Sequence, residues 1–349
     1  MSIKLKLGKK SIGIGEPTYI IAEMSANHAN KIENAKKIIH AAKESGADCI
    51  KIQTYKPDTL TIDSDKECFI IDNGIWKGKK LYSLYEQAYT PWEWHDELKV
   101  EAENVDIDFF STPYEKTSVD FLEEIGVEFY KVASFSITNI PFLEYLAKKN
   151  KPIILSTGMS TLGEIEEAVN SIKAQGNEKI ALLKCSSAYP AVPEDMNIKT
   201  MNNLLDIFDV PVGLSDHSYG FISAVTAVAL GANIIEKHFC LSRDIQTPDS
   251  KFSLEPEEFK EMVKNVRIAE KAVGEINYGL SDTEKNSRIF RKSIFVVKDI
   301  KIGEKFTENN IRIIRPGYGL KPKYYKRIIG KKATENIERG TPLTWDYIG

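Results

Sequence analysis

Two histidines stand where apolar segments of the chain become polar. His217 follows the segment VPVGLSD and His238 follows NIIEK, and the chain holds five histidines in all. A single histidine of this kind is most simply a core imidazole that donates to a backbone carbonyl, but two at equivalent ends of neighbouring segments favour a metal site. Two imidazoles leave positions open for water and substrate oxygens, so the pair suits Mn²⁺, Mg²⁺, Co²⁺ or Fe²⁺ better than a closed structural zinc site.

Four charged residues interrupt apolar segments in a similar way: Glu23, Lys51, Lys131 and Glu236. Burying a charge is costly unless the group is paired or functional. One such residue alone would more often belong to a satisfied barrel interior, but four near the same rim indicate a site. Lysines combined with small hydroxyl groups bind phosphate or carboxylate.

Parallel strands would bring these residues together, because their carboxyl ends meet at one edge. Eight apolar segments have the length of strands: 19–25, 49–55, 108–114, 128–134, 152–158, 180–190, 210–217 and 233–239. Helical spacing follows in 33–46, 92–105, 117–125, 139–150, 162–175, 197–208, 221–231 and 257–273. This alternation predicts an α/β fold, a (β/α)8 TIM barrel whose site lies at the carboxyl ends of the strands. A doubly wound open sheet is disfavoured, because it usually has fewer strands and no glycine-rich loop follows the first one.

The polar residues at the predicted strand ends define the candidate site. Those with acid, base or cationic side chains are Glu23, Lys51, Lys131, His217, His238, Glu236 and, in the following loop, Asp249. Those with amide or hydroxyl groups are Gln53, Thr112, Tyr114, Ser134, Ser136, Ser156, Ser187, Tyr189 and Ser215. Further residues stand at the strand ends without an assigned role: Ser25, Asn27, His28, Tyr55, Ser111, Thr157, Gly158, Lys184, Ser186, Asp216 and Lys237.

Two regions depart from the alternation. Residues 56–90 form a long insertion after the second strand, carrying Trp76 and several tyrosines, with helical spacing only near KLYSLYEQA. A long loop at a catalytic rim usually acts as a lid or a pocket wall. The barrel domain is expected to span 1–278, followed by a linker at 279–287 and a small β-rich domain at 288–349.

The charge is unevenly distributed. Residues 285–349 carry a net charge of +10, whereas the rest of the chain carries −13. The basic residues alternate with Ile, Val and glycine turns and form no nucleic-acid motif, so a basic domain docking on an acidic body is favoured over a nucleic-acid arm.

The composition indicates the cellular compartment of the protein. No apolar run approaches the roughly 18 residues that a membrane span needs, and the basic start is followed by no apolar stretch typical of a signal peptide. The four cysteines form no CxxC pair, which favours reduced thiols. We therefore expect a cytoplasmic protein with neither membrane nor nucleic-acid partners.

Taken together, the motifs resemble one enzyme family. The stretches IAEMSANHA, IKIQTY, STP, YKVAS, LSTGM, GLSDHS, IEKHF and PDSKFSLEPEEF are similar to the sialic acid (N-acetylneuraminate) synthase family, and RPGYGL and GKKA resemble its C-terminal antifreeze-like (SAF) domain. The insertion and TPDSKFSLE look like the pseudaminic acid synthase branch. The resemblance implies metal-dependent condensation of phosphoenolpyruvate, water and 2,4-diacetamido-2,4,6-trideoxy-L-altrose, giving pseudaminate and phosphate by C–O cleavage. N-acetylneuraminate and legionaminate synthases, which act on other N-acetylated hexoses, are the alternatives within the family.

The resemblance also implies roles for residues. It makes His217 and His238 ligands of a divalent metal, Mn²⁺, Mg²⁺ or Co²⁺, that polarises the sugar aldehyde. It assigns phosphoenolpyruvate to Lys51, Lys131, Ser134, Ser156 and Ser215, makes Glu23 the candidate base, and likens Asp249 and Glu236 to sugar- or metal-facing acids. Arg315, in RPGYGL, would reach a partner's active site in a domain-swapped homodimer; the alternative is that it pairs within its own domain.

One departure from the family pattern concerns Ser136, in YKVASFSI, where the family generally has a glutamate. Either another residue supplies that carboxylate or the substrate preference differs. The departure is also the sole support for a non-catalytic alternative, a sugar-binding protein. Within the pseudaminate interpretation, a sugar without a 6-hydroxyl needs an apolar wall, and the aromatic insertion 76–89 is the candidate for it.

Overall fold

The structure is a computed structural model that describes residues 4–349, and the chain divides into two compact units between Gly274 and Glu275. Within residues 4–274, eight parallel strands form a closed barrel, which confirms the predicted (β/α)8 fold. The strands are β3 (Tyr19–Glu23), β4 (Cys49–Thr54), β5 (Asp108–Pro113), β6 (Tyr130–Val132), β7 (Ile153–Ser156), β8 (Ile180–Cys185), β9 (Val212–Asp216) and β10 (Ile234–His238). The barrel closes where β10 pairs with β3, with Ile235 opposite Ile20.

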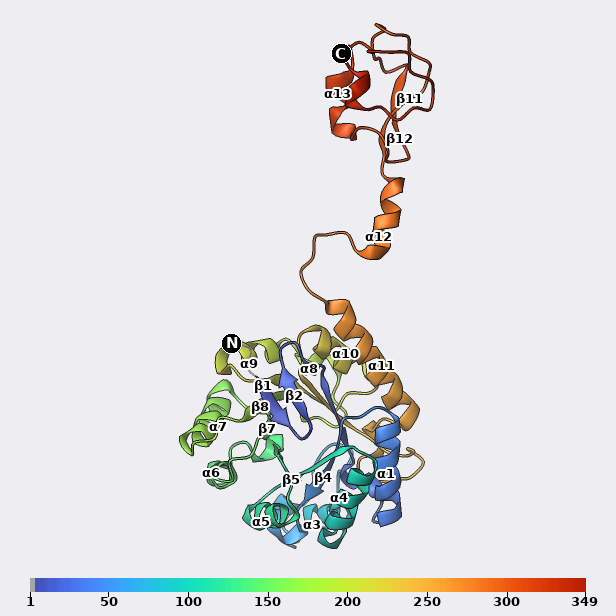
Figure 1. Ribbon diagram of the computed structural model, residues 1–349. Coiled ribbons are helices and arrows are strands. Elements are labelled where there is room, and N and C mark those ends of the chain that lie inside the picture. The colour runs from blue at the N-terminus through green and yellow to red at the C-terminus, as the bar shows by residue number, and fades with distance from the viewer. Residues whose placement is uncertain (1–3) are drawn as a thin grey trace. The chain divides into compact units, whose positions relative to one another are not determined.

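Helices surround the barrel (Figure 1). They are α1 (Ile32–Glu44), α4 (His95–Asn104), α5 (Lys116–Ile125), α6 (Ile140–Ala147), α7 (Leu162–Ala174), α8 (Pro193–Met196), α9 (Thr200–Phe208), α10 (Ile222–Ala229) and α11 (Pro256–Val273). The longer helices bury an apolar face; in α1 the buried residues are Ala35, Ile38, Ile39 and Ala42, at i, i+3, i+4 and i+7. This packing holds the strands in place, and so fixes the positions of the residues at their ends.

A hairpin that the sequence analysis missed closes the amino-terminal end of the barrel. Strands β1 (Lys4–Leu7) and β2 (Lys10–Gly13) pair antiparallel, and Leu5, Leu7 and Ile12 join the apolar cluster inside the barrel. The strands have four residues each, and because of their lysines the segment was interpreted only as a basic start of the chain. With this end sealed, the opposite rim is the open one.

The insertion folds into short elements over that rim. Helices α2 (Pro57–Leu60) and α3 (Leu81–Ala88) contact each other, and 3-10 turns form at Glu67–Phe69 and Trp92–Trp94. Two tryptophans hold this region to the barrel: Trp76 Nε1, within the insertion, donates to the Pro248 carbonyl at 3.2 Å, and Trp92 Nε1, just after it, donates to the Tyr55 carbonyl at 3.2 Å.

The second unit is small. It contains α12 (Asp282–Ser287), the antiparallel strands β11 (Ser293–Val296) and β12 (Ile311–Ile314), and α13 (Tyr325–Ile328). Its own core is formed by side chains such as Ile294, Phe306 and Leu343. Across residues 4–349, no helix combines the length and apolarity that crossing a membrane requires.

Candidate active site

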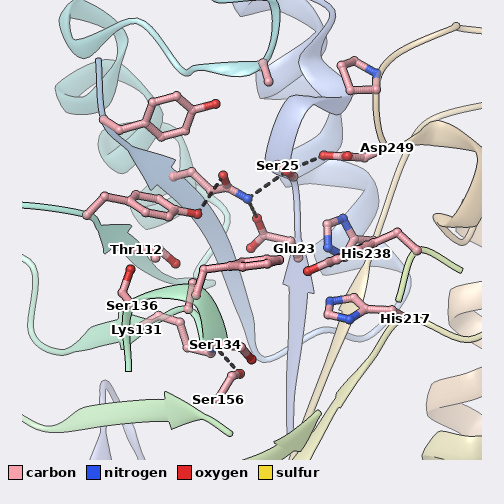
Figure 2. Close-up of a pocket in the computed structure, with 18 of the residues that line it drawn as sticks. Glu23, Ser25, Thr112, Lys131, Ser134, Ser136, Ser156, His217, His238 and Asp249 are labelled. Carbon is pink, nitrogen blue, oxygen red and sulfur yellow. Dashed lines mark hydrogen bonds between the residues drawn. The ribbon is translucent and has the colours of Figure 1, made fainter. Parts of the chain in front are cut away.

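A cavity of about 490 Å³ opens among the carboxyl ends of the strands. It is lined by every residue of the predicted site except Ser187 and Arg315. The predicted residues that line it are Glu23, Lys51, Gln53, Thr112, Tyr114, Lys131, Ser134, Ser136, Ser156, Tyr189, Ser215, His217, Glu236, His238 and Asp249. Figure 2 shows that the two histidines lie together on one side of the cavity, with Lys131, Thr112 and Ser136 on the other.

The charged residues form one buried cluster. Lys51 Nζ lies 3.1 Å from Glu23 Oε2 and 2.9 Å from Glu236 Oε2, and Lys131 Nζ lies 3.8 Å from Glu236 Oε1. Strand register creates the cluster, since Glu23 pairs with Lys51 across β3 and β4. Two cations and two carboxylates compensate one another in a space largely closed to water, which meets the condition for burying them.

This cluster shifts the pKa values of its members. Burial raises the pKa of Glu236, but Lys131 and Lys51 outweigh burial and lower the pKa to about 2. Burial lowers the pKa of Lys131 to about 8, against the attraction of Glu236. The pKa of Glu23 is raised, because burial and the charge of Glu236 together exceed the effect of Lys51. Glu23 is therefore the stronger base of the two carboxylates.

Short donors surround the lysines. Lys131 Nζ donates to Ser156 Oγ at 2.5 Å, and Ser215 Oγ donates to Glu236 Oε1 at 2.9 Å. The backbone N–H of Gly158 donates to Ser134 Oγ at 3.0 Å. A Cβ atom at Gly158 would lie 2.3 Å from Ser187 Oγ, so Ser187 sits behind this glycine rather than in the cavity lining.

The two histidines lie next to each other in the cavity. Their ring centroids are 5.4 Å apart. His217 Nδ1 lies 2.9 Å from the Ser186 carbonyl and donates to it in the tautomer that leaves Nε2 free, which is the usual outer-shell bond of a ligating histidine. His238 Nδ1 is buried and has no hydrogen-bond partner among residues 4–349.

A divalent metal fits these residues. Burial and the proximity of His217 hold the pKa of His238 well below its usual value, so its imidazole is neutral, as ligation requires. Burial lowers the pKa of His217, but Cys185 and the Ser186 carbonyl outweigh burial and raise it, so metal binding at His217 would displace a proton. Within the described residues, no group of three or more His, Cys, Asp or Glu side chains is placed to hold a metal. A metal at the histidine pair would thus keep most of its coordination for water and substrate.

A hydrogen-bonded chain connects the remaining polar residues. Gln53 Nε2 donates to Glu23 Oε1 at 2.9 Å and to Ser25 Oγ at 2.8 Å, and Tyr114 OH donates to Gln53 Oε1 at 3.1 Å. Ser25 Oγ in turn donates to Asp249 Oδ2 at 2.5 Å (Figure 2). This chain fixes the orientation of both Glu23 and Asp249.

Some lining residues had no assigned role in the sequence analysis. Ser25 stood at a strand end, but its position in the chain of hydrogen bonds was not foreseen. Cys185 ends β8 and was expected only to be a reduced thiol, yet it lines the cavity with its Sγ 3.6 Å from His217 Nδ1. The apolar lining residues are Leu60, Ile71, Trp76, Leu81, Leu84, Tyr85, Ala88, Ala133, Phe135 and Pro248. Such residues carry no chemical signal, although the spacing of 81, 84, 85 and 88 is that of one helix face.

Arg315 belongs to the second unit. It directly follows β12 and its side chain is exposed. Within residues 4–349 it forms no ion pair and no side-chain hydrogen bond that would bear out the alternative of pairing inside its own domain.

The chain matches known families over most of its length. Residues 38–278 match the NeuB family and residues 291–348 match the SAF domain. A pseudaminic acid synthase of Campylobacter jejuni is 49% identical over 325 residues, covering 93% of this chain and 95% of that protein. An N,N'-diacetyllegionaminic acid synthase of Legionella pneumophila is 37% identical, covering 98% of this chain and 97% of that protein.

Solved structures agree with the sequence relatives. A crystal structure of an N-acetylneuraminic acid synthetase from Leptospira borgpetersenii, in complex with citrate, superposes with a TM-score of 0.74 at 33% identity, covering 82% of this chain and 95% of that chain. The family match, the relatives and the barrel with its carboxyl-end cavity lead to the same conclusion: the chain belongs to the NeuB family and carries a C-terminal SAF domain.

Proposed function

We propose that the chain is a pseudaminic acid synthase, which condenses phosphoenolpyruvate with 2,4-diacetamido-2,4,6-trideoxy-L-altrose and water to give pseudaminate and phosphate. The observation that carries the proposal is the joining of a lysine–serine group and a histidine pair in one cavity, in a chain 49% identical to the Campylobacter jejuni pseudaminic acid synthase. The chain is an enzyme rather than a sugar-binding scaffold, because it aligns with synthases over nearly its whole length.

The lysine–serine group binds phosphoenolpyruvate in this proposal. Lys51 and Lys131 neutralise its phosphate and carboxylate, while hydroxyls of Ser134, Ser156 and Ser215 donate to the same oxygens. Lys131 then stabilises the negative charge that grows on the departing phosphate. Its buried position strengthens this effect, because little water screens the charge.

Bond changes follow from the two substrates. A C–C bond forms between C3 of phosphoenolpyruvate and C1 of the aldehyde, whose oxygen takes up a proton and becomes a hydroxyl. Water adds to C2, and the C2 keto group forms as its hydroxyl loses a proton and the bond from C2 to the phosphate oxygen breaks. Glu23 accepts the proton of that water, for which its raised pKa suits it. Asp249, held by Ser25, orients sugar hydroxyl or amide groups.

His217 and His238 would hold the divalent metal, Mn²⁺, Mg²⁺ or Co²⁺. When bound, such an ion acts as a Lewis acid toward the aldehyde oxygen. Ser136, where the family generally has a glutamate, lies in the lining near Ser134 and contributes a hydroxyl in place of a carboxylate.

Arg315 would complete a neighbouring site in a domain-swapped homodimer, and its exposed, unpaired guanidinium together with the basic character of the second unit supports this role. We further propose a cytoplasmic location, in keeping with the free cysteines.

Phosphate release tests the function. The protein is incubated with phosphoenolpyruvate and Mn²⁺ and either the trideoxy altrose or N-acetylmannosamine, each with and without a chelator. We expect chelator-sensitive release with the trideoxy sugar. Release with N-acetylmannosamine instead would assign the chain to neuraminate synthesis, and a legionaminate precursor in a third arm covers the other relative. Release with no sugar would contradict the proposal.

A further inference from the structure

The cavity has a second, chemically different side. Seven of its lining residues come from the insertion 56–90: Leu60, Ile71, Trp76, Leu81, Leu84, Tyr85 and Ala88, here called the insertion wall. Among the described lining residues, none from this segment is charged, although the insertion holds many acidic and basic residues. Most of those charged side chains are exposed. Although Ile62, Ile70 and Ile75 are exposed as well, the side of the insertion that meets the cavity carries no charged group.

Helix α3 shows this sorting most clearly. Leu81, Leu84, Tyr85 and Ala88 occupy i, i+3, i+4 and i+7 and all line the cavity, whereas Glu86 and Gln87 are exposed. Leu84 is buried, and serves packing as well. Leu81, Tyr85 and Ala88 remain half-buried, so part of this apolar stripe is left for whatever fills the cavity.

The wall is fixed to the catalytic rim. Trp76 donates its indole N–H to the carbonyl of Pro248, the residue before Asp249, and its ring lies 5.6 Å from that of Tyr189. Tyr189 in turn packs 4.3 Å from the His217 ring. Because its N–H is engaged, Trp76 offers the cavity an apolar ring face.

A ligand that fills this cavity must therefore have a polar side and an apolar side. The barrel floor, formed by the polar residues at the strand ends, takes phosphate, carboxylate and hydroxyl groups, while the insertion wall, whose one hydroxyl belongs to Tyr85, takes mainly apolar surface. We propose that the insertion wall, through Leu81 and Tyr85 of α3, contacts the methyl groups of the sugar and selects a 6-deoxy sugar over its 6-hydroxy counterpart.

This inference rests on the proposed function and goes beyond it by naming the residues that set specificity. An apolar site discriminates against one added hydroxyl by roughly 10²-fold at most, because it penalises the hydroxyl without a specific clash. We therefore expect a preference of about 10- to 100-fold in kcat/KM for the trideoxy altrose over 2,4-diacetamido-2,4-dideoxy-L-altrose.

The test is the ratio of kcat/KM for these two sugars, measured by phosphate release at saturating phosphoenolpyruvate. We expect Leu81→Asn and Tyr85→Asn to lower the ratio about tenfold, mainly through poorer use of the deoxy sugar. Leu81→Met, which stays apolar, should keep the ratio. Gln87→Ala, on the exposed side of the same helix, is the matched control and should leave both constants unchanged.

The outcomes separate the two proposals. If the wild-type protein uses the trideoxy sugar but shows no preference, or if both Asn variants retain the wild-type ratio, the role of the insertion wall is overturned while the synthase function stands. If the wild-type protein uses neither sugar, the proposed function fails, and this inference with it. Circular dichroism of each variant shows whether a change in ratio accompanies loss of folding, and a variant that has lost its fold is replaced by Leu81→Thr.

Discussion

The floor and the insertion wall of one cavity are built on opposite principles. The floor consists of strand ends whose register sets Glu23 beside Lys51 and Ser215 beside Glu236, with charges held in place by the barrel on both sides. The insertion wall belongs to a surface segment, and its seven apolar or aromatic residues line the cavity from two short helices and the loop between them. Rigid, buried charges suit bond breaking, because they need no reorganisation during reaction. An apolar surface suits selection, which needs shape and the absence of polar partners.

The largest effect should come from breaking the floor at the histidine pair. We expect His238→Ala to lower kcat by about 10³-fold, the upper range for loss of one preorganised electrostatic group. Equilibrium dialysis should show weaker Mn²⁺ binding by the same variant. Unchanged activity together with unchanged metal binding would show that His238 is not a metal ligand.

Removing a lysine should have the next largest effect. Lys131→Met deletes the cation that contacts Ser156 and approaches Glu236, and a charged hydrogen bond contributes about 1.5–3 kcal/mol. We therefore expect kcat/KM for phosphoenolpyruvate to fall about 10- to 100-fold, for either sugar alike. A fall in kcat/KM with only one of the sugars would mean that Lys131 contacts the sugar rather than the phosphate.

The pH profile should sharpen the view of the floor. Lys131, with its pKa lowered to about 8, loses its charge as pH rises through that value, so kcat/KM should fall on the alkaline side, by about tenfold per pH unit at the limit. Glu23 is active when ionised, and its raised pKa places the acidic limb above the usual glutamate range. Lys131→Arg should move the alkaline limb to higher pH. A limb that stays near 8 in this variant would assign it to another group.

The smallest effect is expected at the anchor of the wall. Trp76→Phe keeps an aromatic ring but loses the hydrogen bond to the Pro248 carbonyl, which contributes about 1 kcal/mol. We expect the KM for the sugar to rise about fivefold, with the KM for phosphoenolpyruvate unchanged. An equal rise in both constants would show that Trp76 supports the whole rim.

The difference between the floor and the insertion wall also explains how well the sequence predicted each of them. The floor was predictable, because charges such as Lys51 and Glu236 interrupt apolar strands and the barrel rule places them at one end. The wall was predicted only as a region, since Leu81 and Tyr85 differ in no way from residues that pack in a core. The hairpin β1–β2 was missed because its strands have only four residues each, too few for a clear periodic pattern.

The sequence could not predict which side chains contact each other, because these contacts join distant parts of the chain. The bond from Ser25 to Asp249 joins residues 224 positions apart, and the position of Cys185 beside His217 depends on the register of β8 against β9, in which Cys185 pairs with Ser215. Neither is encoded in local spacing. The position of Arg315 relative to any active site depends on how two compact units assemble, and remains a prediction.

The central claim is that the floor carries out the reaction and the insertion wall selects the sugar. A competition experiment between two sugars tests it most directly. The trideoxy altrose and its 6-hydroxy counterpart are mixed at equal concentration with phosphoenolpyruvate, and mass spectrometry of the two products gives the ratio of their kcat/KM values. The account predicts that Lys131→Met forms both products more slowly in the wild-type ratio, whereas Leu81→Asn shifts the ratio toward the 6-hydroxy product. A shifted ratio in Lys131→Met together with an unchanged ratio in Leu81→Asn would contradict it.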